Sequence, residues 1–385
     1  MYKLYMMSLV LVAVILLAGC GNLQTGNVEI EKTVENLPEL PYGDDLQAIL
    51  DDTLSQYAAG KGLSAAIIVP GYQPWLGVSG ISHGTTPITP ETVFDAGSTH
   101  KNFTGAAILI LAEEGVFSLD DPINKWLPDY PNIDGEITIR QLLNHTGGVY
   151  DMVRHPDYWE AIMWDTFRVW EREEILHNFL LEPYFPKGEG WHYSTPGYIL
   201  LRMIIEVATG KDLATIYHTY LWDKIPLEHT YLATYEDLPE ETAHGWFDLD
   251  ADGGYEELPS SISFNSSTGG AIFATPEDLA LWAQALYHDQ RVLSEEALEQ
   301  MLTFEPTTPD EPITVGYGLG AINYSPEIFS GLEIIGHSGN GAGYVAASLY
   351  LPDYGVSLGI MLNTHDGPML VINDLLKVVI EYLEE

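Results

Sequence analysis

Three short motifs of this chain contain residue types that nucleophilic hydrolysis requires. Ser98 and Lys101 lie three positions apart where a helix is expected to begin, so both side chains share one helical face. A helix N-terminus offers free N–H groups and a positive dipole end, which favour a developing oxyanion. The ordinary pKa of lysine is about 10.4, and burial or a neighbouring cation would lower it, so that a neutral amine could accept the serine proton. On its own, this spacing more often marks a serine at a helix start beside a solvated lysine.

The other two motifs supply further candidates. Tyr193-Ser194-Thr195 follows a glycine-containing loop and leads into a helix that is expected to begin near Pro196. A tyrosine on such a loop can act as an acid or a base if a nearby lysine lowers its pKa from about 10. The run of residues 336–341 closes an apolar strand, and its glycines let a substrate backbone approach the strand edge.

Together these motifs resemble those of the serine β-lactamase and penicillin-binding-protein superfamily, and most closely those of class C β-lactamases with their D-Ala-D-Ala carboxypeptidase and esterase relatives. The likeness spans about residues 45–380. The motifs occur in the family order: Ser98-x-x-Lys101, Tyr193-Ser194-Thr195 and His337-Ser338-Gly339. Supporting stretches lie at 94–97, 119–122, 141–148 and 269–271. The resemblance implies an α+β fold, in which an antiparallel β-sheet is flanked by N- and C-terminal helices and a mainly helical subdomain is inserted.

The same resemblance implies a role for each motif residue. Ser98 would be the acylated nucleophile, Lys101 its activating partner, and Tyr193 the general base for acylation and for the water of deacylation. The backbone N–H groups of Ser98 and Asn340 would form the oxyanion hole. Substrate contacts would come from four motif residues: Thr195, His337, Ser338 and Gly339. The family chemistry requires no metal and no other cofactor.

Two positions depart from the family pattern. Thr195 stands where the family usually has asparagine, whose amide touches the substrate carbonyl and the motif lysine, and a threonine hydroxyl can make only one of those contacts. His337 stands in place of a lysine, as in some carboxypeptidase and esterase members. With an ordinary pKa of about 6.5, it would offer a substrate carboxylate a weaker and pH-dependent charge. Both changes argue against efficient β-lactamase activity, but they leave the acyl-enzyme machinery intact.

Other functional classes match the sequence less well. Gly336-His337-Ser338 resembles the nucleophile elbow of α/β-hydrolases, but Asn340 occupies the last glycine position and a strand is expected where the elbow needs a helix. The histidines are scattered and form no H-E-x-x-H motif, which argues against a metal enzyme. A catalytically inactive relative that binds peptidoglycan or a protein partner stays open, with Thr195 as its main support. Retention of the motif serine, lysine and tyrosine weighs against that alternative, because a binding module needs none of them.

Periodicity and turn residues predict the elements that position the motifs. Helices are predicted over 44–57, 98–115, 170–181, 199–209, 276–287 and 369–382. Strands are predicted over 63–69, 75–81, 315–321, 333–337, 344–351 and 356–362. Both ends of the body would therefore build one antiparallel sheet around a helical insertion at about 117–302. Substrate specificity is expected to lie in this insertion and its loops, including residues 150–172.

The first residues predict export. Lys3 precedes an apolar run over 9–18 that is too short to span a bilayer comfortably, which is the layout of a secretory signal. Leu17-Ala18-Gly19-Cys20 resembles a bacterial lipobox, which implies a lipid anchor on the only cysteine of the chain; an ordinary signal or anchor helix is the alternative. Residues 1–20 would form the signal peptide, 21–43 a flexible acidic tether, and 44–385 the hydrolase domain. We expect a membrane-anchored lipoprotein that faces the extracytoplasmic side.

The charge balance limits the partners. The 385 residues include 15 Lys and Arg against 56 Asp and Glu, a formal net charge of −41. Such a surface repels phosphate backbones and excludes nucleic-acid binding. The sequence therefore predicts an anchored serine hydrolase that acts through an acyl-enzyme on Ser98, on small esters, D-amino-acid peptides or related amides. Weak β-lactamase activity is compatible with this prediction, and the oligomeric state is left open.

Overall fold

The structure is a computed structural model that describes residues 37–56, 61–248, 254–258, 261–308, 314–364 and 368–385. The predicted signal peptide with Cys20, and most of the predicted tether, lie outside these described residues. Among the helices of the described residues, none combines the length and the apolar character that a membrane crossing requires.

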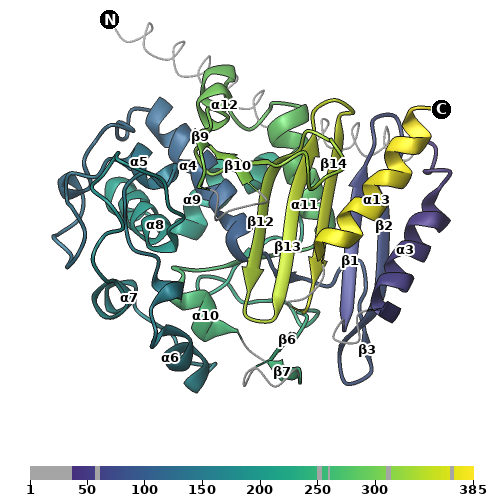
Figure 1. Ribbon diagram of the computed structural model, residues 1–385, viewed down its shortest axis with the longest axis horizontal. Helices are drawn as coiled ribbons and strands as arrows, with labels where there is room; N and C mark the ends of the chain where they lie inside the picture. Colours follow the sequence, from purple (N-terminus) through teal and green to yellow (C-terminus); the bar gives the residue numbers. More distant parts are fainter. Residues whose placement is uncertain (1–36, 57–60, 249–253, 259–260, 309–313, 365–367) are drawn as a thin grey trace, which may run out of the picture.

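A nine-stranded antiparallel sheet forms the centre of the molecule (Figure 1). Its strand order is β3-β2-β1-β14-β13-β12-β11-β10-β9. The N-terminal strands are β1 Gly62–Ile68, β2 Trp75–His83 and β3 Thr86–Pro87. The C-terminal strands are β9 Glu305–Pro306, β10 Thr314–Tyr317, β11 Ile322–Tyr324, β12 Ile335–Gly341, β13 Tyr344–Leu351 and β14 Val356–Leu362. The predicted sheet built from both ends of the body is confirmed.

The two ends of the chain meet where β1 pairs with β14. Leu63 lies opposite Leu362 and Ile68 lies opposite Ser357 in this ladder. Every residue of β13 and β14 is buried, because layers of helices cover both faces of the sheet here. Continuous apolar runs, rather than alternating ones, are what such doubly covered strands require.

Helices from both termini form one of the covering layers. The first helix, α3 Gly43–Gln56, and the last, α13 Pro368–Leu383, pack against each other on one face of the sheet (Figure 1). Leu46 and Leu50 of α3 are fully buried and lie four residues apart, as an apolar stripe on one helix face requires. On the opposite face, α11 Pro276–Ala283 packs against β1, β13 and β14.

The middle of the chain forms a mainly helical region beside the sheet (Figure 1). Its helices are α4 His100–Glu113, α5 Ile139–Leu143, α6 Tyr158–Trp164, α7 Arg172–Asn178, α8 Thr195–Thr209, α9 Leu213–Tyr220, α10 Ile262–Ser267 and α12 Glu295–Met301. Single turns are η1 Gly97–Thr99, η2 Ile123–Lys125, η3 Met152–Arg154 and η4 Trp222–Lys224, and α11 continues into the π-helical turn η5 Gln284–His288. Two small sheets complete the region. The first has the strand order β4 Phe94–Asp95, β8 Ile272–Ala274 and β5 Tyr231–Leu232, and the second pairs β6 Gly245–Phe247 with β7 Glu256–Leu258.

The α+β fold class is confirmed, but some boundaries differ from prediction. The strand expected over 333–337 begins at Ile335 and continues to Gly341, so the whole third motif lies within β12. The strand expected over 315–321 ends at Tyr317, because the chain turns there and the Gly320 carbonyl accepts a hydrogen bond from Asn102 Nδ2 of α4 at 2.8 Å. The two small sheets were not predicted, since two- and three-residue strands leave no periodic pattern.

Candidate active site

A tight turn presents Ser98 at the start of α4. Asp95 lies just before the turn, and its Oδ1 accepts the Gly97 N–H at 2.8 Å. Gly97 adopts φ +50°, in the left-handed region that favours glycine. The single turn η1 follows and leaves Ser98 half-buried, while its neighbours Gly97 and Thr99 are buried. The sequence Asp-Ala-Gly-Ser therefore fixes the direction of the nucleophile locally.

Strand β12 lies directly against this turn. A Cβ atom on Gly339 would lie 2.2 Å from the Ala96 carbonyl oxygen and 2.5 Å from the Ser98 nitrogen, so only glycine permits this approach. Ser98 and Asn340 consequently line the same small pocket of about 20 Å³. That the backbone N–H groups of Ser98 and Asn340 form an oxyanion hole stays a prediction. An oxyanion hole of this kind requires the two backbone segments to approach as closely as they do here.

Lys101 lies one turn beyond Ser98 and is fully buried. Its Nζ lies 3.1 Å from Ser98 Oγ, in hydrogen-bond contact. The pKa of Lys101 is lowered to about 7, chiefly by burial; the Asp151 carboxylate opposes this shift, and the buried cation Arg202 adds to it. A substantial fraction of the amine is therefore neutral near pH 7 and can accept the serine proton.

Asp151 is the buried acidic neighbour of this pair. Its Oδ1 accepts the Thr195 N–H at 3.2 Å, and its own N–H lies 3.3 Å from the Tyr184 hydroxyl. Burial raises the pKa of Asp151, while the Thr195 hydrogen bond and the Lys101 charge lower it. Asp151 thus interacts with two motifs, through its hydrogen bond to Thr195 of the second motif and through the charge of Lys101 in the first.

Tyr193 packs against Lys101 from the second motif. The Lys101 Nζ lies 4.9 Å from the centroid of the Tyr193 ring, and the His145 ring lies 4.4 Å from it, centroid to centroid. His145 Nδ1 accepts the Ser194 N–H at 3.2 Å, and Ser194 Oγ accepts the Gly197 N–H at the start of α8. The predicted helix start is present, and the ring of Tyr193 lies beside the Lys101 amine.

The structure corrects one expectation about His337. This residue is buried, its Nδ1 donates to the Ser338 carbonyl at 2.6 Å, and its Nε2 accepts from the Tyr317 hydroxyl at 2.8 Å. Burial, with the nearby Lys101 charge, lowers the pKa of His337 to about 3. The imidazole is therefore neutral at physiological pH and does not supply the pH-dependent charge that the sequence suggested.

The other predicted substrate contacts lie at the same place. Thr195 lines the small pocket with Ser98 and Asn340, and its backbone N–H is held by Asp151. On β12, Ser338 is half-buried and Asn340 is exposed, and alternation places these two side chains on one face of the strand. All residues of the predicted site are therefore brought together by the fold, although their contacts with a substrate remain predictions.

A model of the beta-lactamase family matches residues 50–379 of this chain. The chain belongs to the beta-lactamase family. Within that family, penicillin-binding protein 4* of Bacillus subtilis (strain 168) is 31% identical over 296 residues, which are 73% of this chain and 62% of that protein. The chain thus spans about three fifths of the length of this curated relative.

Two solved structures of beta-lactamase-like proteins superpose over most of this chain. The D-stereospecific amidohydrolase from Streptomyces sp. has a TM-score of 0.73 and 27% identity, over 85% of this chain and 97% of that one. The D-amino acid amidase from Ochrobactrum anthropi SV3 has a TM-score of 0.75 and 25% identity, over 88% of this chain and 98% of that one. The α+β architecture is therefore that of the family.

Sequence reasoning missed several residues that shape this beta-lactamase-family site. Asp151 lies 42 residues before Tyr193 and Tyr317 lies 20 residues before His337, whereas Arg202 lies seven residues after Thr195 in the predicted helix. All three are buried, and this burial, which no short stretch of the sequence shows, is what makes the charges of Asp151 and Arg202 matter in the site. Within the described residues, no group of three or more His, Cys, Asp or Glu side chains clusters as a metal site requires.

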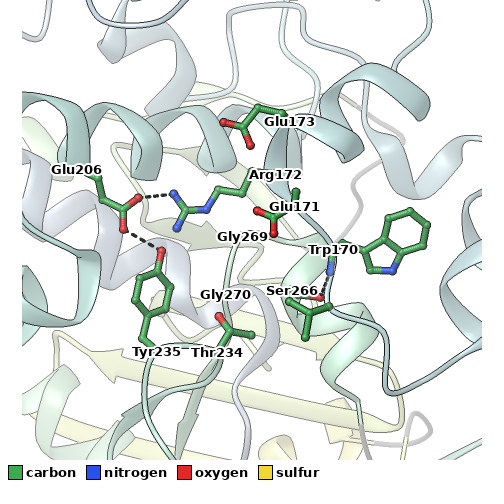
Figure 2. Close-up of a pocket in the computed structure, with 11 residues that line it drawn as sticks. Trp170, Glu171, Arg172, Glu173, Glu206, Thr234, Tyr235, Ser266, Gly269 and Gly270 are labelled. Atoms are coloured by element: carbon green, nitrogen blue, oxygen red, sulfur yellow. Dashed lines mark hydrogen bonds and ion pairs between the residues drawn. The ribbon is translucent and has the colours of Figure 1, made fainter.

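A wider cavity of about 360 Å³ is lined in part by Gly269 and Gly270, and Ser98 is not among its lining residues (Figure 2). It contains an ion pair between Arg172 Nη1 and Glu206 Oε2 at 2.5 Å, and the Tyr235 hydroxyl donates to Glu206 Oε1 at 2.8 Å. These contacts occupy both oxygens of the Glu206 carboxylate, and no activated nucleophile faces the cavity. We therefore place the chemistry at the smaller pocket beside Ser98.

Proposed function

We propose that this protein is a serine hydrolase that forms an acyl-enzyme on Ser98 with D-amino-acid amides, short D-peptides or related esters. The observation that carries the proposal is the 3.1 Å contact between Ser98 Oγ and the buried Lys101 amine. Burial lowers the pKa of that amine to about 7, so it can act as a base near neutral pH.

In the proposed acylation step, Ser98 Oγ attacks the substrate carbonyl while its proton passes to Lys101 Nζ. The carbonyl oxygen becomes an oxyanion, which the backbone N–H groups of Ser98 and Asn340 stabilise. Tyr193, beside the Lys101 amine, then delivers its proton to the leaving amine or alkoxide and regains one from the Lys101 ammonium. The C–N or C–O bond breaks, and the acyl group stays on Ser98.

In the proposed deacylation step, a water molecule attacks the ester carbonyl of the acyl-enzyme. The Lys101–Tyr193 pair removes a proton from this water, and Ser98 Oγ leaves with a proton from the same pair. The neutral, buried His337 holds the Tyr317 hydroxyl on one side of this pair and contributes no charge. Recognition of a substrate carboxylate therefore has to come from groups other than His337.

The substrate class rests on the relatives. The two solved structures are of a D-stereospecific amidohydrolase and a D-amino acid amidase, and both superpose over nearly their whole length. The curated relative is a penicillin-binding protein. The names of the two amidases specify D-configured substrates, which is why we propose that class over β-lactams.

The experiment that tests the proposal is intact-protein mass spectrometry after treatment with a fluorophosphonate. We expect one adduct on the parent protein and none on Ser98→Ala, because only an activated serine reacts. Ser55→Ala, which removes an exposed serine of α3, is the matched control and should label like the parent. If the folded parent takes no adduct, the hydrolase proposal fails and an inactive peptidoglycan- or protein-binding relative replaces it.

We further propose that the protein is exported and anchored through a lipid on Cys20. The support is the order of a basic residue, an apolar run and a single cysteine in the first twenty residues. The full-length chain should fractionate with bacterial membranes, and Cys20→Ala should release it from them. Equal membrane association of both proteins would contradict lipid anchoring.

A further inference from the structure

We propose that Phe264, Trp159 and Phe247 form an aromatic wall that is the subsite for a large apolar, preferentially aromatic, side chain on the substrate residue that Ser98 attacks. This inference deepens the proposed function, on which it rests. The wall lies in the helical region, where the sequence predicts that substrate specificity is determined but does not identify the residues.

The wall begins in the pocket of the nucleophile. Phe264 of α10 lines the small pocket together with Ser98, Thr195 and Asn340. Its side chain is 8% exposed, so one part of the ring packs in the core and another faces the pocket. A substrate carbonyl at Ser98 therefore has an aromatic face as its neighbour.

The wall continues from the pocket toward solvent. The Trp159 ring of α6 stacks on Phe264 with centroids 5.6 Å apart and an interplanar angle of 9°. The same indole stacks on Phe247 of β6, with 5.9 Å between centroids and 20° between planes. Trp159 is 37% exposed, so this continuous aromatic surface reaches the outside of the protein.

Hydrogen bonds hold α6 and α10 together and make the wall rigid. The Tyr158 hydroxyl lies 2.7 Å from Ser267 Oγ, and Ser263 Oγ donates to the Ile162 carbonyl at 2.8 Å. Figure 1 shows α6, α10 and β6 gathered at one edge of the molecule. A preorganised surface of this kind binds an apolar group without the entropy loss of ordering loose side chains.

The chemistry of the surroundings favours an apolar occupant. The end of α6 and the connection after it expose two further large apolar side chains, Trp164 at 87% and Phe167 at 65%. The chain carries 56 acidic residues, so an exposed apolar segment of this size is unusual for its surface. Stacked aromatic rings bind another ring in offset or edge-on geometry more strongly than they bind a methyl group. For a primary amide substrate, the only side chain available to the wall is that of the acyl residue.

The test compares two amides with the full-length protein. We expect D-phenylalaninamide to be hydrolysed with a kcat/KM about tenfold above that of D-alaninamide or more. Trp159→Ala should remove most of this preference, because KM for D-phenylalaninamide should rise far more than KM for D-alaninamide. Trp126→Ala, a half-buried tryptophan outside the wall, is the matched control and should keep the preference.

A binding arm separates this inference from the proposed function. Ser98→Ala should bind D-phenylalaninamide about tenfold more tightly than D-alaninamide in calorimetric titrations, and adding Trp159→Ala should abolish the difference. Equal affinities, or an equal loss for both amides in Trp159→Ala, would overturn the aromatic subsite. Absence of turnover together with the expected binding preference would instead reject the hydrolase function and keep the subsite.

Discussion

At the residue scale, activation of Ser98 depends on how the buried charges around Lys101 balance. Burial and Arg202 favour the neutral amine, whereas Asp151 favours the ammonium form. A lysine that remained exposed would keep its ordinary pKa and would seldom be neutral near pH 7.

Replacing Asp151 by asparagine should shift the pH dependence of acylation. The amide oxygen can still accept the Thr195 N–H, but the negative charge that raises the pKa of Lys101 is lost. The rate of fluorophosphonate labelling falls as Lys101 becomes protonated, so its acid limb should move to lower pH by about one unit. Asp165→Asn is the control, because Asp165 also accepts a backbone N–H but is exposed. An acid limb that stays in place would show that Asp151 does not act on Lys101.

Asp95 should make stability depend on pH. Burial raises the pKa of Asp95 from 3.8 to about 7, so the folded protein binds a proton that the unfolded chain releases between about pH 4 and pH 7. The free energy of unfolding should therefore decrease as pH rises through this window, by up to roughly 4 kcal/mol. Urea unfolding at pH 5 and pH 8 measures this decrease. It should be smaller in Asp95→Asn, and Asp129→Asn at an exposed position should not change it.

At the element scale, catalytic geometry depends on how closely β12 approaches η1. The strand carries the third motif and the single turn carries the nucleophile, and they touch where Gly339 faces Ala96 and Ser98. The strand register places His337 opposite Ser348 and Asn340 opposite Val345, so the sheet fixes which residues of β12 reach the site. A small displacement between these two elements separates the predicted oxyanion donors.

Gly339→Ala should therefore impair both stability and acylation. The new Cβ would lie within 2.5 Å of backbone atoms that cannot rotate away. We expect a loss of about 1–3 kcal/mol in the free energy of unfolding and about a hundredfold slower fluorophosphonate labelling. Gly197→Ala is the contrast, because its Cβ would meet its nearest atom at 3.6 Å inside helix α8. That variant should gain about 0.5–1 kcal/mol, and equal behaviour of both variants would reject the proposed role of the close approach.

At the scale of the whole molecule, charge is the dominant property. A net charge of −41 on 385 residues produces self-repulsion that opposes the compact state. Few ion pairs offset it in the described part of the chain, and several of them are exposed, such as that of Lys377 with Glu381. Exposed pairs contribute little to stability.

Added salt should consequently stabilise the protein. We expect the melting temperature to rise from 0.05 M to 1 M NaCl, because the Debye length shortens from more than 10 Å to about 3 Å and screens the repulsion. Sucrose at the same osmolality is the control for effects of excluded solute, and it should raise the melting temperature less. A melting temperature that falls with NaCl would show that ion pairs outweigh repulsion.

The sequence by itself determined the order of the motifs and most of the elements that position them. The Ser98–Lys101 spacing, the helix start after Tyr193 and the paired strands at both ends depend on residues near one another in the chain, so local patterns predict them. The family resemblance of the three motifs then implied the fold class, and the structure has it.

Only the tertiary structure decided how the site is charged and what surrounds it. His337 is neutral because it is buried in the sheet, where Tyr317, 20 residues earlier in the chain, hydrogen-bonds to it. Asp151 acts on the charge of Lys101, although it lies 50 residues further along the chain. The aromatic wall joins Trp159 to Phe264 across about 100 residues. Burial and long-range packing set pKa values and pocket walls, and neither quantity is encoded in any short stretch of the chain.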